Sequence, residues 1–196
     1  MARLQTLEPV DFPEEYKEFL GPEIMAERDK MGIMRIWAQR PDISMAFRTF
    51  TATVFANSLL SRRTIELLRL RVAFHNQCRS CMAIRYSPAV QAGVTEELVC
   101  ELANPEEGPN ISEAERVALR YADLMATNHL AIDDAIFNEM RKHFSEPEII
   151  EIGTHIAYCI GFGRLGMSWD MVDDLPARFH DRTELVTPWG EDATVV

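Results

Sequence analysis

Apolar residues recur at helical spacing along most of this chain, and glycine and proline stand at the borders of these stretches rather than inside them. Phe47, Phe50, Val54 and Phe55 form one such stripe. Strand-like alternation is nowhere sustained, and no glycine-rich phosphate loop follows a strand. The pattern therefore predicts an all-α fold and gives no support to a nucleotide-binding α/β fold.

Helix borders can be placed from turn and capping residues. Ser112 with Glu115, and Ser145 with Glu148, have the spacing of capping boxes. We expect a helix that contains Pro88 to be kinked or interrupted there, since proline has no N–H group. The expected helices cover 11–21, 23–30, 33–39, 44–60, 62–76, 78–93, 95–103, 112–127, 133–144 and 147–171.

A length of 196 residues with 47% hydrophobic content predicts a single domain. We expect a core at about 40–175, a helical N-terminal extension at 1–40 and an irregular C-terminal arm at 176–196. The chain has 31 acidic against 20 basic residues, a formal net charge of −11, which argues against a nucleic-acid partner. Its apolar runs are too short to span a bilayer, and the N-terminal residues do not resemble a signal peptide, so we predict a cytoplasmic protein with no membrane partner.

The four cysteines are Cys78, Cys81, Cys100 and Cys159, and only the first two are close in sequence. A single Cys-x-x-Cys lacks the second pair that a zinc ribbon requires, so we predict neither a metal nor a cofactor. In a reducing compartment a disulfide framework is not expected either. The surroundings of Cys100 and Cys159 are apolar, and we expect both to fill the core.

Cys78 and Cys81 are three residues apart, so on a helix they face the same side. At a helix N-terminus, unpaired N–H groups favour the thiolate, which is the reactive form. Arg79 and Arg85 add positive charge, and Arg85 lies one helical turn after Cys81. If the chain reverses direction at 76–77, Glu66 comes close to this region and a carboxylate there could relay a proton.

At these residues the chain resembles a known family. Glu66, Cys78 and Cys81 follow the pattern Glu-x11-Cys-x-x-Cys-x3-His of the AhpD-like alkylhydroperoxidases, within the carboxymuconolactone decarboxylase superfamily. The resemblance covers about 40–175, and Arg85 stands where the family has its last histidine.

The resemblance implies an AhpD-like helical bundle that assembles into trimers or hexamers. It also implies that Cys81 attacks a hydroperoxide and becomes a sulfenic acid, that Cys78 resolves it as a disulfide, and that an external dithiol partner reduces the pair. In this scheme Glu66 belongs to the proton relay.

Arginine stays protonated, so Arg85 cannot shuttle a proton as histidine does. It could form a structural ion pair with Glu66, lower the thiol pKa, or bind an anionic substrate. Two histidines could replace the missing relay: His75, three residues before Cys78, and His155 in the last long helix. His155 has apolar neighbours, which favours a buried, hydrogen-bonded core residue instead.

Three functions remain open. The first is a thiol peroxidase of the AhpD-like type, working through a Cys78–Cys81 dithiol/disulfide cycle. The second is a lyase on a small carboxylate or lactone, as in the decarboxylase branch, in which arginine would hold the anion. The third is a redox-sensing oligomer without catalysis. The apolar faces of 44–60 and 147–171 predict a homo-oligomer in each case.

Overall fold

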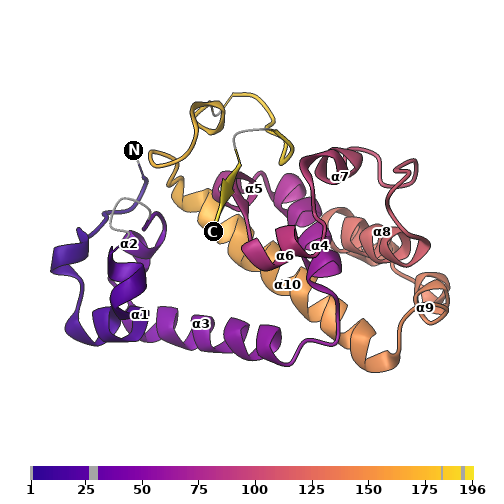
Figure 1. Cartoon of the computed structure of the whole chain (residues 1–196), viewed down its shortest axis with the longest axis horizontal. Helices are drawn as coiled ribbons and strands as arrows, with labels where there is room; N and C mark the ends of the chain where they lie inside the picture. Colours follow the sequence, from indigo (N-terminus) through magenta and orange to yellow (C-terminus); the bar gives the residue numbers. More distant parts are fainter. Residues whose placement is uncertain (1, 27–30, 182, 191–192) are drawn as a thin grey trace. The chain divides into compact units, whose positions relative to one another are not determined.

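The computed structural model describes residues 2–26, 31–181, 183–190 and 193–196 (Figure 1). It is almost entirely helical and so confirms the predicted all-α class. The chain divides into two compact units, which are described separately: Met1–Ser58 with Ser168–Asp174, and Leu59–Met167 with Leu175–Val196. The domain boundaries expected from the sequence stay a prediction.

The described residues of the first unit form a 3-10 turn and three helices. They are η1 Pro9–Asp11, α1 Glu14–Ala26, α2 Met34–Trp37 and α3 Pro41–Ala56. Phe12, Tyr16 and Leu20 form the centre of its core. The hydroxyl groups of Tyr16 and Ser44 lie 2.8 Å apart and link α1 to α3.

The borders in this unit agree with the turn residues in part. Gly21 interrupts α1 with a φ of 80°, as the predicted helix end there requires. Helix α3 begins at Pro41, earlier than the predicted residue 44, because proline is well suited to a first helical turn. It ends at Ala56 rather than at residue 60. The last four residues of the helix predicted for 23–30 lie outside the described residues.

The second unit carries the predicted redox motif. Its elements are α4 Arg62–Asn76, α5 Arg79–Ala83, β1 Ile84–Arg85, α6 Ser87–Gln91, α7 Glu96–Glu101, α8 Glu113–Thr127, η3 His129–Ala131, α9 Asp134–Met140, α10 Glu146–Trp169, η4 Ala177–Phe179 and β2 Thr194–Val195. The border of α4 agrees with the prediction, and α8 begins at the predicted Ser112 capping box. None of the described helices is long and apolar enough to cross a membrane. The cytoplasmic location stays a prediction.

Helix α4 is the centre of this unit. Leu67, Leu68 and Leu70 are at most 2% exposed, and α4 packs against α8. Close approach of α10 to α4 depends on Gly163. A Cβ atom added there would lie only 2.6 Å from the amide nitrogen of Asn76 at the end of α4.

The continuous helix predicted for 78–93 is wrong. The structure breaks it into α5, the short strand β1 and α6, with Pro88 in the first turn of α6. The strand exists because β2 of the C-terminal arm pairs with it in parallel, Ile84 opposite Thr194 and Arg85 opposite Val195 (Figure 1). Sequence periodicity does not report a pairing between segments about a hundred residues apart.

Candidate redox site

The two cysteines of the motif lie at the turn between α4 and α5. Gln77 ends α4 in the left-handed conformation, with a φ of 50°, and the Cys78 amide donates to the Ala73 carbonyl. This turn produces the chain reversal that the sequence analysis expected. Because α5 begins at Arg79, the pair lies at a helix N-terminus, as predicted.

Cys78 and Cys81 are joined by a disulfide, with their Cα atoms 5.2 Å apart. Cys78 is 1% exposed, whereas Cys81 is only partly buried. The Ser80 hydroxyl lies 3.7 Å from the Cys78 sulfur. The two residues therefore differ in exposure, and Cys81 is the more accessible of the two.

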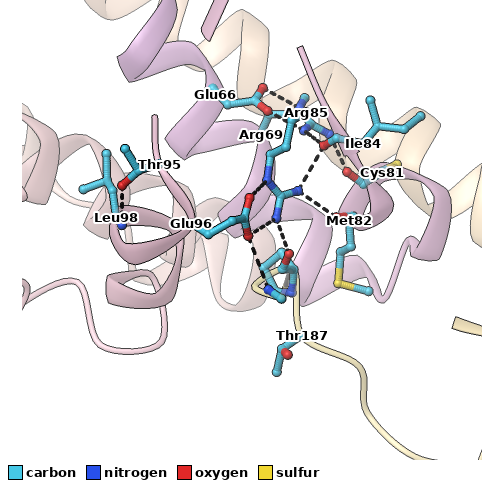
Figure 2. Close-up of polar contacts among 12 residues, drawn as sticks. Glu66, Arg69, Cys81, Met82, Ile84, Arg85, Thr95, Glu96, Leu98 and Thr187 are labelled. Carbon is cyan, nitrogen blue, oxygen red and sulfur yellow. Dashed lines mark hydrogen bonds and ion pairs between the residues drawn. The ribbon is translucent and has the colours of Figure 1, made fainter. Parts of the chain in front are cut away.

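Glu66 lies in the first half of α4, and its carboxylate is held by a residue that the sequence analysis did not consider. Arg69 donates from Nε to one Glu66 oxygen at 2.8 Å and from Nη2 to the other at 2.7 Å (Figure 2). The Glu66 side chain is 2% exposed and that of Arg69 10%. Among the described residues, no hydrogen bond joins either Glu66 oxygen to a sulfur. The carboxylate is instead the ion-pair partner of Arg69.

Arg69 also holds the peptide segment that carries Cys81. Its Nη1 donates to the Cys81 carbonyl at 2.5 Å and its Nη2 to the Ile84 carbonyl at 2.7 Å (Figure 2). Its guanidinium carbon lies 5.0 Å from the centre of the Tyr86 ring. Burial on its own would lower the pKa of Arg69, but the charge and hydrogen bonds of Glu66 raise it above its usual value. Arg69 is therefore a permanent cation.

A signal for Arg69 was present in the sequence. Arg69 stands three positions after Glu66, which is the spacing of a helical ion pair. The sequence does not show that Arg69 also binds the carbonyls of Cys81 and Ile84. These contacts depend on how α5 and β1 fold against α4.

Of the three roles left open for Arg85, the ion pair with Glu66 is wrong. Arg85 pairs with Glu96 of α7, with Nε at 2.7 Å and Nη2 at 3.0 Å from the two carboxylate oxygens (Figure 2). It also donates to the carbonyls of Met82, Ile84 and Pro188. Its side chain is only 2% exposed. An arginine so enclosed cannot reach a substrate anion, so the substrate-binding interpretation is not supported.

The structure directs His75 away from the redox pair. Its Nε2 lies 2.7 Å from Asp123 of α8, whose two oxygens also accept from Arg71 at 2.6 and 2.9 Å. The physical reason is helical geometry, since Glu66 and His75 are nine residues apart and therefore on opposite faces of α4. A shuttle role for His75 stays a prediction that this geometry does not favour.

The Asp123 cluster gives a testable pH dependence. Burial raises the pKa of Asp123, but the hydrogen bonds from His75 and Arg71 outweigh it and hold the pKa below the ordinary 3.8. A carboxylate with a lowered folded-state pKa stabilises the fold above its unfolded value and loses that contribution as the pH falls through the lowered value. We expect Asp123→Asn to cost about 2 kcal/mol of unfolding free energy at pH 7 and progressively less below about pH 4.

Urea denaturation of Asp123→Asn and wild type at a series of pH values measures this difference. Asp134→Asn, at an exposed position on α9, is the control and should cost little at any pH. A cost for Asp123→Asn that persists unchanged at pH 3 would contradict the assigned ion cluster.

His155 is a buried core residue, as the sequence analysis favoured. It is 2% exposed, with Nδ1 at 3.0 Å from the Tyr158 hydroxyl and Nε2 at 3.3 Å from Glu151. Burial lowers its pKa, although the Glu151 hydrogen bond opposes the shift. The imidazole is therefore neutral near pH 7 and fully engaged on its own helix.

The two remaining cysteines differ from each other. Cys159 is partly buried on α10, and burial raises the pKa of its thiol to about 11 despite the opposing charge of Arg69. Such a thiol is inert at neutral pH, as expected for a packing residue. Cys100 is exposed on α7, so its predicted burial is wrong.

The C-terminal arm packs against the redox turn and is held there by hydrogen bonds. The Gln77 side chain exchanges two hydrogen bonds with the Val186 backbone, at 2.8 and 3.0 Å. Arg79 donates to the Asp181 carbonyl at 2.6 Å. Phe179 is fully buried in a cluster with Met82 and with the partly buried Cys81. The charge that Arg79 was expected to add near the sulfurs is therefore used to hold the arm.

Comparison with known proteins identifies the class of this fold. Residues 41–124 match the model of the carboxymuconolactone decarboxylase family. The match covers less than half of the chain and confirms, over these residues, the resemblance to the carboxymuconolactone decarboxylase superfamily.

Two solved structures with similar folds are named as peroxidase-related proteins. One is an uncharacterized peroxidase-related protein with an alkylhydroperoxidase AhpD core from Ralstonia eutropha JMP134, with a TM-score of 0.76 and 17% identity over 91% of this chain and 94% of that one. Another is an uncharacterized peroxidase-related protein from Silicibacter sp. TM1040, with a TM-score of 0.74 and 18% identity over the same shares. At these identities the likeness establishes the fold alone.

Curated relatives are similar over part of their length. The uncharacterized protein Rv2313c of Mycobacterium tuberculosis is 35% identical over 119 residues, which are 59% of this chain and 41% of that protein. The uncharacterized protein YdfG of Bacillus subtilis is 24% identical over 103 residues, 48% of this chain and 65% of that protein. The chain thus spans less than half of the first relative's length and just under two thirds of the second's.

Proposed function

We propose that this chain is a thiol-dependent peroxidase of the AhpD-like type, which reduces hydroperoxides through a Cys78–Cys81 dithiol/disulfide cycle. The observation that carries the proposal is the joined pair itself, with one sulfur enclosed and the other partly open at the same turn. A reactive thiol beside a resolving thiol is the arrangement that such a cycle needs.

The different exposure of the two cysteines supports the roles that the proposal gives them. The Cys81 thiolate attacks the outer oxygen of the hydroperoxide, breaks the O–O bond and becomes a sulfenic acid, while the alkoxide leaves. The Cys78 thiol gives its proton to that alkoxide, and the Cys78 thiolate then attacks the sulfenic sulfur. Hydroxide leaves, takes a proton from solvent, and the disulfide forms. An external dithiol returns two electrons and two protons to the pair.

Thiol counting tests the cycle directly. The reduced chain has four thiols. We expect one equivalent of cumene hydroperoxide to lower the count to two, and peptide mapping to locate the new disulfide at Cys78 and Cys81. Loss of fewer than two thiols would overturn the peroxidase proposal. Loss of two thiols without turnover in the presence of dithiothreitol would favour a redox sensor.

The lyase alternative required an arginine that holds a substrate anion. Arg85 is enclosed and bonded to Glu96 and to backbone carbonyls, so this site offers no such group at position 85. The family name alone favours the alternative.

A homo-oligomer is also part of the proposal. Large apolar side chains are exposed on α10, with Ile150 at 70%, Phe162 at 37% and Met167 at 36%. Burial of these side chains against further copies would remove apolar surface from water. Size-exclusion chromatography with light scattering should give a mass of at least twice the 22.4 kDa of one chain, and a mass of 22.4 kDa would contradict the oligomer.

A further inference from the structure

We infer that Arg69 is the positioning cation of the redox pair: it holds Glu66 as a counter-ion, anchors the turn that carries Cys81, and places a permanent positive charge beside that sulfur. The inference deepens the proposed function and rests on it for its catalytic meaning. It gives Arg69 the effect on the thiol pKa that was one of the three roles left open for Arg85.

The contacts of Arg69 set it apart from the two other arginines near the pair. Arg79 is 6% exposed and donates to carbonyls of the C-terminal arm, and Arg85 binds Glu96 on α7. Arg69 alone among these three bridges a motif carboxylate and the backbone of a motif cysteine (Figure 2). It therefore connects the two halves of the predicted Glu-x11-Cys-x-x-Cys pattern.

Covalent geometry limits how far the Arg69 charge can lie from the Cys81 sulfur. The Cys81 carbonyl oxygen accepts from Nη1 at 2.5 Å, and this oxygen is separated from its own Sγ by four bonds. The guanidinium is nearly buried, at 10% exposure, so solvent screens its charge only weakly. A cation at this place favours the thiolate of the reduced protein.

Glu66 has the opposite effect on the same sulfur. Its two oxygens each accept a hydrogen bond from Arg69, so its negative charge cancels part of the arginine's field. Removal of Arg69 would leave a buried carboxylate and disfavour the thiolate. Removal of the Glu66 charge would leave an uncompensated cation and favour it. A pair that served only the fold would not produce shifts of opposite sign.

The experiment measures the rate of Cys81 alkylation by iodoacetamide against pH in the reduced full-length chain, resolved by peptide mass spectrometry. Arg69→Gln should raise the midpoint of the profile by about one pH unit, and Glu66→Gln should lower it. Arg69→Lys, which keeps the charge, should stay near wild type. Arg71→Gln is the matched control, since Arg71 lies on the same helix in a two-pronged ion pair with Asp123. Its midpoint should not move.

Midpoints that shift in the same direction for Arg69→Gln and Glu66→Gln, or that do not differ from Arg71→Gln, would overturn the inference. If Arg69→Gln does not fold, Glu66→Gln decides alone: a lower midpoint supports the inference, and an unchanged or higher one overturns it. The expected shifts in a chain that does not consume peroxide would overturn the proposed function and leave Arg69 as the positioning cation. Peroxide turnover with unshifted midpoints would overturn the inference only.

Discussion

Cys81→Ser should abolish peroxide consumption, with a loss on the order of a thousandfold or more, because the serine hydroxyl is not ionised at neutral pH and cannot replace the nucleophilic thiolate. The fold should survive, since the side chain is similar in size and only partly buried. Turnover of cumene hydroperoxide with dithiothreitol as reductant measures the effect, and circular dichroism checks the fold.

The control for this prediction is Cys100→Ser. Cys100 is exposed on α7 and has no place in the proposed cycle, so turnover should remain at the wild-type level. Equal activity of Cys81→Ser and wild type toward a lactone or a small carboxylate would instead place the chain in the lyase branch. The proposed peroxidase would then be wrong.

Arg85→His should destabilise the protein by about 3 kcal/mol without any gain of peroxidase turnover. The substitution restores the family's residue at this position. However, an imidazole cannot replace the five hydrogen bonds that Arg85 makes with Glu96, Met82, Ile84 and Pro188. Loss of these bonds loosens β1 and the C-terminal arm together. Urea denaturation measures the stability, and the peroxide assay measures the turnover.

Arg120→His is the matched control, because Arg120 forms a two-pronged pair with Glu106 at 3.0 Å on the surface. Both side chains are largely exposed, so its cost should stay below about 1 kcal/mol. A rise of turnover in Arg85→His would show that a histidine at this position can still serve a proton relay, contrary to the burial of Arg85 in the structure.

Local signals were sufficient for much of the second unit. The α4 helix begins at the Ser61 cap and ends where Gln77 turns left-handed, and the Ser112–Glu115 capping box opens α8. These features involve neighbours within a few residues, so their physical causes are visible in the printed sequence. The pairing of Cys78 with Cys81 is local in the same sense.

The long-range partners could not be predicted in this way. The sequence offers several carboxylates that Arg85 could bind. It binds Glu96 because the turn after α6 brings the first residue of α7 next to it. The arginine and glutamine side chains around the cysteines bind backbone carbonyls of the C-terminal arm. Every residue has a backbone carbonyl, so the sequence does not indicate which of them will be bound.

The order of the residues fixed the helical class, the place of the cysteine pair at a helix start, and the presence of a carboxylate one helix earlier, because spacing and capping act over one or two turns. Folding in three dimensions settled which charge stands beside that pair. Arg69 and Arg85 are both arginines near the motif, but they have different partners. Arg69 binds the Glu66 carboxylate and the Cys81 carbonyl. Arg85 binds the Glu96 carboxylate. Electrostatic effects depend on distance and burial, and neither is a property of sequence separation.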